Sequence, residues 1–277
     1  MKKIVLPHSI KERSAIILVT KELPCLFTLK KILDSSCKVN GVIFCDRKKW
    51  IDRLKKEIRD IKNYGLIKRL SQIFLSIYFY LIHSKSDKDY LKNCYNNFDV
   101  DEVFSSLILR NIDFIFTSDY QSVESLRFIK KKSPDFLVSH TPYWIGKKVR
   151  EISKEKIVIG SHPGLVPFYR GAHSAFWCIY DEEPEKNGYS IFCLNQGVDS
   201  GPLIKQEKIC YIKEISYRSN DYLLMKHMSV AQAKIVESYS NGQLLTLTNQ
   251  NNLNPSQIKK APGIIDYFRF RLKQNLK

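Results

Sequence analysis

The chain has 277 residues, of which 44% are hydrophobic and 26% charged, as in an ordinary globular protein of one large domain or a main domain with a small appendage. Forty-five Lys and Arg against 28 Asp and Glu give a formal net charge of +17. Such a charge attracts nucleotides, phosphates, nucleic acid or an acidic membrane surface, and by itself it does not choose among these anions.

Cysteine usage and hydropathy restrict the class of protein further. The seven cysteines are scattered and form no CxxC pair, which favours reduced thiols, a cytoplasmic location and no metal site. Pro7, His8 and Lys11 interrupt the apolar stretch that a secretory signal would need. The most apolar segment, residues 70–82, is too short to span a bilayer, so we expect no transmembrane helix.

Short apolar runs alternate with segments of helical periodicity. Runs at residues 14–20 and 39–46 flank a helix predicted over 22–33, and runs at 112–118 and 135–140 flank a helix predicted over 122–133. A further run, at 156–162, follows. Strands of a parallel sheet read as continuous apolar runs because both of their faces are covered. The pattern predicts an α/β fold, with a Rossmann-like, mostly parallel sheet and helices on both faces.

Residues 47–100 interrupt this alternation with a basic first half and an aromatic second half. We expect the segment to be largely helical and consider three roles for it. A helix covering the sheet is the favoured one. The others are a surface for a protein or homodimer partner and a patch that lies at a membrane interface.

The last part of the chain follows two predicted strands, at 189–194 and after Gly201. Residues 219–243 have the spacing of a helix packed on the core, residues 249–255 form a polar break, and a final amphipathic helix follows. We therefore divide the chain into a main domain over 1–205, with the insertion at 47–100, and a small C-terminal extension over 206–277.

One histidine stands out by its position. In the stretch IGSHPGLVPFYRG, His162 comes directly after an apolar strand, and Pro163 and Pro167 stiffen the loop that follows. Ligands of open α/β sheets bind beyond the carboxyl ends of the strands, so we expect His162 at a crevice. A purely structural loop histidine is the alternative.

A second polar loop lies in YSIFCLNQGVDSGPLI, where Asp199 stands between Gly197 and Gly201. The glycines leave the backbone free to place this acid against a ligand. A carboxylate beside His162 would stabilise its imidazolium form. A simple turn, in which Asp and Gly are favoured, is the alternative.

Together the two stretches resemble the core of the folate-dependent formyltransferase family, and are closest in type to its sugar-nucleotide N-formyltransferases. That family has a strand ending in Asn-x-His, then Pro-x-Leu-x-Pro-x-x-Arg-Gly, then an Asp in Gly-x-Asp-x-Gly-Pro. The matching positions are His162, residues 163–171 and Asp199. The resemblance implies that residues 1–205 form a catalytic domain, an N-formyltransferase that moves a formyl group from N10-formyltetrahydrofolate to a primary amine.

The resemblance also implies roles for individual residues. His162 would donate a hydrogen bond to the formyl oxygen, and Asp199 would relay the proton that the amine loses. The other implied contacts are to the folate, by His140, Thr141, Asn195, Gln196 and Val198, and to the acceptor, by Arg170 and His173. No metal is implied.

One position departs from the family pattern. Gly160 stands where the family has its catalytic Asn, and losing one such donor costs about 2.7–4 kcal/mol of transition-state stabilisation. Ser161, His140, His173 and backbone amides near Gly164 are candidate substitutes, although Ser161 should point away if the strand stays extended. The alternatives are a formyl-folate hydrolase and a degenerate relative that binds ligand without turnover.

The acceptor is inferred from length and charge. The residues after the Asp199 loop are too few for a full RNA-binding barrel, so we expect no specific nucleic-acid partner. An amino sugar linked to a nucleotide diphosphate is favoured as the small-molecule acceptor, because its phosphates suit a basic surface.

Overall fold

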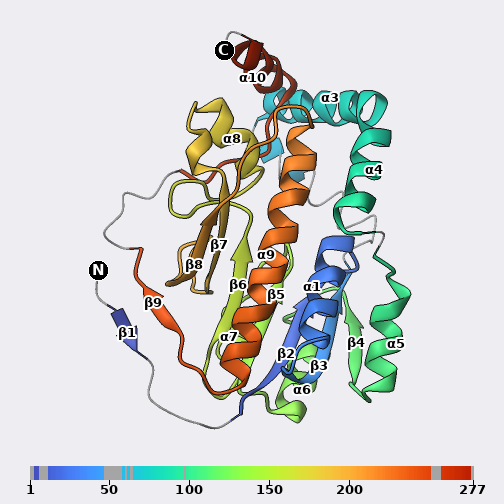
Figure 1. The fold of residues 1–277 in the computed structure, drawn as a ribbon, viewed down its shortest axis with the longest axis vertical. Coiled ribbons are helices and arrows are strands. Elements are labelled where there is room, and N and C mark those ends of the chain that lie inside the picture. Colours follow the sequence, from blue (N-terminus) through green and yellow to red (C-terminus); the bar gives the residue numbers. More distant parts are fainter. Residues whose placement is uncertain are drawn as a thin grey trace.

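A nine-stranded sheet forms the centre of the molecule in this computed structural model (Figure 1). The structure describes residues 3–5, 12–46, 58–59, 61–62, 65–96, 98–250 and 257–275. The strands are β1 (Lys3–Val5), β2 (Ser14–Val19), β3 (Lys38–Cys45), β4 (Phe114–Thr117), β5 (Phe136–His140), β6 (Val158–His162), β7 (Gly188–Cys193), β8 (Leu203–Lys208) and β9 (Thr246–Thr248). Their order is β1-β9-β8-β7-β6-β5-β2-β3-β4.

Helices cover the sheet and its upper end (Figure 1). They are α1 (Leu23–Leu33), α3 (Leu66–Ile82), α4 (Ser84–Cys94), α5 (Asp101–Leu109), α6 (Val123–Lys132), α7 (Lys147–Arg150), α8 (Ser174–Tyr180), α9 (Tyr217–Ser240) and α10 (Ile264–Asn275). A short 3₁₀ helix, η1, spans Pro184–Lys186.

The α/β fold class predicted from the sequence is confirmed. Strands β4, β3, β2, β5 and β6 pair in parallel, and β7, β8, β9 and β1 continue the sheet with antiparallel pairs. Successive residues of the central strand β2 enter different hydrophobic clusters. Ile17 packs with residues of α1, α5 and α9, whereas Ile16 packs with residues of α6 and α7. Both faces of the sheet are therefore covered.

The C-terminal segment belongs to the same sheet and core. The expected boundary at residue 205 falls inside β8, and β9 pairs with both β8 and β1. Helix α9 contributes Met228 and Val236 to the cluster that also contains Ile17. Up to β9, residues after 205 thus complete the main domain in the described structure.

The insertion is helical where it is described, but α3 does not have the favoured role. Residues 47–57, 60, 63–64 and 97 lie outside the described part of the chain. Helix α3 lies across the upper end of the molecule, where its buried Leu75 and Phe79 pack with Phe176 of α8 and Tyr267 of α10 (Figure 1). The expectation that it covers the sheet is wrong for α3, because its inward face meets helices instead of strands.

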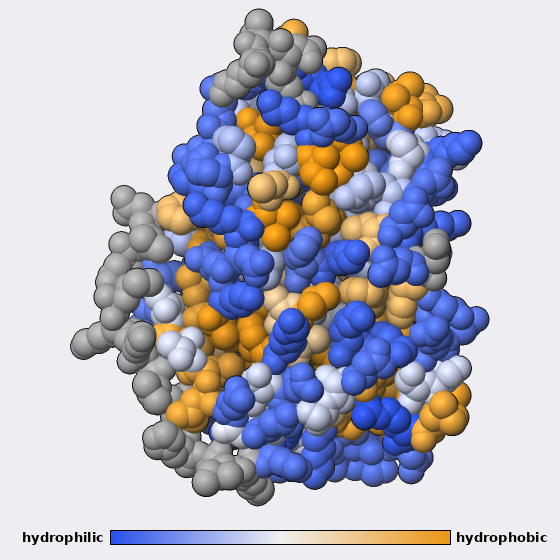
Figure 2. All heavy atoms as spheres, viewed as in Figure 1, coloured by the Kyte–Doolittle hydropathy of each residue, from blue (hydrophilic) through white to orange (hydrophobic). Residues whose placement is uncertain are grey.

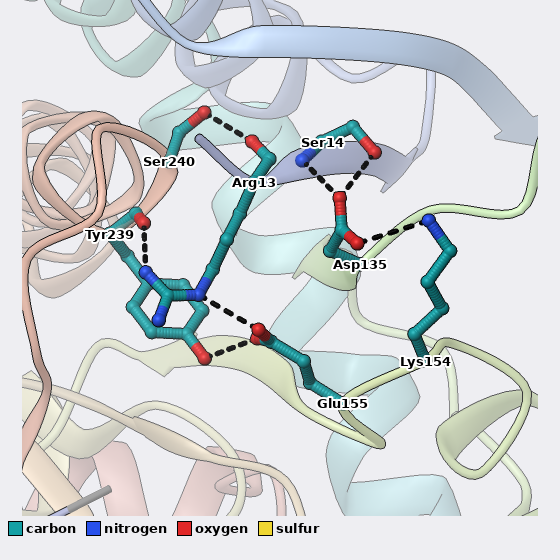
Figure 3. Close-up of polar contacts among 7 residues, drawn as sticks. All are labelled: Arg13, Ser14, Asp135, Lys154, Glu155, Tyr239 and Ser240. Atoms are coloured by element: carbon teal, nitrogen blue, oxygen red, sulfur yellow. Dashed lines mark hydrogen bonds and ion pairs between the residues drawn. The ribbon is translucent and has the colours of Figure 1, made fainter. Parts of the chain in front are cut away.

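A cluster of polar side chains connects the end of α9 with the amino ends of β2, β5 and β6 (Figure 3). The buried Arg13, just before β2, contacts Glu155 at 2.8 Å and donates a hydrogen bond to the Tyr239 carbonyl at 3.1 Å. Beside them, Asp135 accepts hydrogen bonds from the amide and hydroxyl of Ser14. These contacts join segments that are far apart in the sequence.

Candidate active site

The alternation of side chains along β6 divides the site between two faces of the sheet. Gly160 and His162 point to one face, where Leu194 and Asp199 of the β7–β8 loop meet them. Ser161 points to the other face and donates a hydrogen bond to Gln232 of α9 at 2.8 Å. The loop at 194–201 therefore lies over the face that carries His162.

The structure brings His162 and Asp199 together. Nδ1 of His162 lies 3.5 Å from Oδ2 of Asp199, and the two side chains are 7% and 20% exposed. Nε2 of His162 lies 3.0 Å from the Tyr169 carbonyl and 3.2 Å from the Ser174 hydroxyl. Since a carbonyl oxygen only accepts, we assign a proton to Nε2. An imidazolium at this position would have an acceptor for each of its two N–H groups.

Backbone conformation holds Asp199 in place. Asp199 has a φ of +49°, in the left-handed region that Asp tolerates better than most residues. Its Oδ2 accepts a hydrogen bond from the Gly171 amide at 3.1 Å. The Arg170 guanidinium donates to the Val198 carbonyl at 3.3 Å. The stretch after His162 and the loop that carries Asp199 are thus bonded to each other.

A leucine fills the space beside Gly160. A Cβ atom built on Gly160 would lie 2.5 Å from Cδ2 of Leu194, too close unless the leucine moves. No side chain longer than glycine fits this position as the loop is packed. The amide donor that the resemblance implies here is therefore replaced by an apolar contact.

Two candidate substitutes for that donor lie on the opposite face. His140 is buried, and its Nδ1 lies 2.7 Å from Oε1 of Gln232 and 3.3 Å from the Ser161 hydroxyl. Burial lowers the pKa of His140 from its ordinary 6.5 to about 4, although the hydrogen bond with Gln232 opposes the shift. The structure does not bring His140 or Ser161 together with His162.

The other residues implied for the folate lie close to the strand ends. Thr141 follows β5 and is half-buried, and its hydroxyl accepts a hydrogen bond from the Tyr143 amide. Asn195 and Gln196 are exposed at the start of the Asp199 loop, and Val198 is half-buried next to Asp199. Asn195 and Gln196 thus present exposed side-chain amides, whereas His140 is buried.

His173 forms a second histidine–carboxylate pair. Its Nδ1 lies 2.8 Å from Oδ2 of Asp221 on α9, and its ring meets Tyr217 edge to face. The other carboxylate oxygen of Asp221 is buried and has no hydrogen-bond partner among the described residues. His173 directly precedes Ser174, whose hydroxyl contacts His162. The peptide unit between His173 and Ser174 therefore connects the His173–Asp221 pair with the His162–Asp199 pair.

Several residues of the site were not foreseen from the sequence. Gln232, Leu194, Asp221 and Ser174 lie in stretches that read as ordinary helix, strand or loop. Gln232, on α9, is 0% exposed. A glutamine at a core-facing position of a helix is the signal by which the sequence could have identified it. No group of three or more His, Cys, Asp or Glu placed to hold a metal occurs among the described residues.

Cys178 lies on α8, and Cys193 ends β7, the strand that pairs with β6. Burial raises the pKa of the Cys193 thiol to about 12 and that of Cys178 still further. A thiol of such a pKa carries almost no thiolate at neutral pH.

Sequence comparisons relate the chain to formyltransferases. The Formyl transferase family model matches residues 85–223, half of the chain. GDP-perosamine N-formyltransferase of Brucella melitensis is 35% identical over 106 residues, which are 38% of this chain and 40% of that protein. Methionyl-tRNA formyltransferase of Finegoldia magna is 27% identical over 161 residues, 57% of this chain and 50% of that one. The chain thus spans half or less of these relatives.

Solved structures agree in fold. A 4-N formyltransferase from Francisella tularensis aligns with a TM-score of 0.51 at 16% identity, over 93% of this chain and 87% of that one. Glycinamide ribonucleotide transformylase 1 from Symbiobacterium toebii aligns with a TM-score of 0.55 at 10% identity, over 86% and 95%. At such identities the alignments support the α/β fold alone. With the matched family model and the motif that places His162 against Asp199, they lead to one conclusion: the chain belongs to the formyl transferase family.

Proposed function

We propose that the protein transfers a formyl group from N10-formyltetrahydrofolate to the amine of an amino sugar linked to a nucleotide diphosphate. The contact between His162 and Asp199 carries this proposal, because it joins the two residues that the family motif makes catalytic. The similarity to a GDP-perosamine N-formyltransferase supports the acceptor class, and the net charge of +17 suits its phosphates.

The folate donor supplies the formyl carbon, and the protein positions the groups around it. The bond from the acceptor nitrogen to this carbon forms and its bond to the donor nitrogen breaks. His162 donates a hydrogen bond to the formyl oxygen as negative charge develops there, and to do so it gives up its contact with Tyr169 or Asp199. We assign Oδ1 of Asp199 to accept the proton that the amine loses, and one proton passes to the donor nitrogen as it leaves, so that the formylated acceptor and tetrahydrofolate are the products.

Roles for Arg170 and His173 follow from their positions. Arg170 is bonded to the Asp199 loop, so we assign it to positioning that loop as well as to the acceptor's phosphates. His173 is 34% exposed and paired with Asp221, and we assign it to a sugar hydroxyl beside the reacting amine.

A second candidate, binding of ligand without turnover, rests on the packing of Leu194 against Gly160. The same packing leaves the formyl oxygen without one amide donor. A third possibility is hydrolysis of the donor by water. It would release formate in the absence of any amine, which neither formyl transfer nor binding without turnover would do.

The test combines the purified protein with N10-formyltetrahydrofolate and a panel of nucleotide-linked amino sugars. Transfer predicts that the acceptor gains the mass of a formyl group as tetrahydrofolate forms. His162→Ala or Asp199→Asn should lower this rate by at least about 10²-fold with folding intact, because each removes a group that acts at the formyl carbon. Wild-type turnover in both variants would overturn the site, and folate binding without any product would favour the second candidate.

A further inference from the structure

Helix α3 presents an apolar stripe to solvent along its whole length. Ile67, Phe74 and Leu81, spaced seven residues apart, are 82%, 59% and 71% exposed. On the neighbouring α10, Ile265, Phe268 and Leu272 are 55%, 54% and 63% exposed. We call these six side chains the exposed stripe. Monomeric proteins rarely leave so many large apolar residues together in water, and such patches mark interaction sites.

The orientation of α3 is fixed by its other face. Gln72 is 5% exposed and donates a hydrogen bond to the Ala261 carbonyl at 2.8 Å, while Leu75 and Phe79 are buried. Lys68 pairs with Asp266 of α10 at 2.5 Å. The helix thus buries Leu75 and Phe79 together with one polar residue and also exposes large apolar side chains on its other face, unlike a helix whose apolar residues all face a core.

The parts of the exposed stripe on α3 and on α10 meet at one end of the two helices. Ile67 and Lys68 of α3 and Ile265 and Arg269 of α10 line one open groove of about 690 Å³. Figure 2 shows apolar patches among hydrophilic residues at the upper end of the molecule. The groove therefore combines apolar side chains with Lys68, Arg269 and the carboxylate of Asp266.

The charges on α3 and α10 are mostly positive, and two of the cations are paired, Lys68 with Asp266 and Lys273 with Glu182 at 3.3 Å. Helix α3 carries Lys68 and Arg69 and no acid. Helix α10 carries Arg269, Arg271 and Lys273, and its single acid, Asp266, is occupied by Lys68 and the Gly263 amide. In a two-fold contact between copies a patch meets itself, so these cations would face cations. Anionic lipid head groups, in contrast, are complementary to them.

We propose that the exposed stripe docks on the surface of an anionic phospholipid bilayer, with α3 lying in the plane of the interface. Amphipathic helices that bind in this way bury an apolar face among the acyl chains and place Lys and Arg near the head groups. Among the described helices, none is long and apolar enough to cross a membrane. This docking is independent of the proposed formyl transfer.

The first test uses the unmodified full-length protein. Flotation with vesicles of phosphatidylcholine alone, and of phosphatidylcholine mixed with phosphatidylglycerol, measures binding at low and at high salt. We expect binding to the mixed vesicles that is at least about tenfold stronger than to the neutral ones and weakens as salt rises. No binding to the mixed vesicles, or equal binding to both kinds at all salt concentrations, would contradict the proposal.

The second test assigns the binding to the stripe. The variant Ile67→Gln, Phe74→Gln, Leu81→Gln should lose at least about tenfold in vesicle binding, with an unchanged circular dichroism spectrum, because these side chains are exposed. Its matched control is Ile108→Gln, Leu109→Gln on α5, where the two side chains are 71% and 85% exposed away from α3 (Figure 1). Light scattering on both variants tests the competing occupant. A wild-type dimer that the stripe variant alone converts to monomer, with vesicle binding retained, would show that the stripe binds a second copy instead.

Discussion

Gly160 and Leu194 pack against each other beside His162. The family's amide at this position would need the space that Leu194 fills, since a Cβ on Gly160 would lie 2.5 Å from Cδ2 of the leucine. We predict that Gly160→Asn alone destabilises the fold by about 1–3 kcal/mol, as overpacking does. Adding Leu194→Ala should relieve most of this cost, so that the two substitutions couple by more than about 0.5 kcal/mol.

Denaturant unfolding of both single variants and the double variant measures this coupling directly. The double variant also restores an amide next to His162, so its formyl transfer should rise, by up to about 10²-fold. Additive free energies of unfolding would show that Leu194 does not block the position. A rate unchanged in a stable double variant would show that lack of this amide does not limit turnover.

The buried His140 makes stability depend on pH. Its folded pKa of about 4 lies below its ordinary 6.5, so the unfolded chain binds a proton in this range that the folded chain does not. The stability from keeping His140 neutral is therefore complete above pH 6.5 and is lost as the pH falls toward 4. The shift corresponds to about 3 kcal/mol. In His140→Gln the fall in unfolding free energy between these pH values should be smaller by about this amount.

The exposed His227, on α9, provides a comparison for this measurement. His227→Gln shows how this curve responds to the loss of an exposed histidine. If the curve of His140→Gln is the same as that of the wild type, His140 is not held neutral by burial.

Among single residues, the sequence identified those whose neighbours in the chain form a motif. His162 and Asp199 were found because glycines and prolines mark the loops that carry them, and the structure brings the two together. Gln232 and Leu194 were missed because their importance comes from the other segment that each one meets. A single sequence shows local signals of backbone geometry but not which side chain fills a gap on a distant strand.

At the level of secondary-structure elements and loops, the conformation of the stretch after His162 depends on one glycine. Gly171 has a φ of +95°, its amide holds Asp199, and a Cβ there would lie 2.3 Å from the Lys259 carbonyl. We predict that Gly171→Ala costs at least about 2 kcal/mol of stability, through strain and loss of this close approach. Thermal and denaturant unfolding provide the measurement.

A substitution at Gly65 allows the effect of backbone strain to be measured without that of a close contact. Gly65 has a φ of +79°, but a Cβ there would meet no atom within 4 Å. Gly65→Ala therefore carries only the strain of a backbone conformation, φ +79° and ψ 153°, that is populated almost only by glycine, about 1–3 kcal/mol. Equal losses in both variants would show that the contact with Lys259 contributes nothing.

Elements with a strong local pattern were predictable, and others were not. Apolar runs located β2, β3, β5 and β6, and helical spacing located α1, α6 and α9. Helix α8 was missed because it follows directly on the proline-rich stretch and is short. For α3 the helical character was expected but the face it buries was not, since apolar side chains predict a covered helix and many of these are exposed. Periodicity gives the pattern of a face but not the partner that covers it.

For the whole molecule, the order of the strands places the site and the polar cluster of Figure 3 at different ends of the parallel strands. His162 closes the carboxyl end of β6, whereas Arg13 and Glu155 precede the amino ends of β2 and β6. Neither position follows from the sequence alone, because Arg13 and Glu155 are far apart in the chain. Stability and catalysis should therefore respond separately to substitutions at the two ends.

Glu155→Gln tests this separation. It leaves the buried Arg13 without its carboxylate and weakens the bond that the Tyr239 hydroxyl donates to Glu155. A fully buried pair would cost about 3–5 kcal/mol to break, but Glu155 is 32% exposed, so we expect about 2 kcal/mol. Lys154→Gln, which removes a 54% exposed partner of Asp135, should cost less than about 0.5 kcal/mol.

Denaturant unfolding of the two variants gives these free energies, and formyl transfer measured well below the unfolding transition gives the rates. The Glu155 variant should lose stability and keep the wild-type rate, because the end of α9 that it loosens lies beyond Gln232 and away from His162. A rate that falls together with stability would show that Arg13, Glu155 and Tyr239 also position the β6 strand at its far end. The loss of stability would then be a property of the site itself, and the two ends of the sheet would act as one unit.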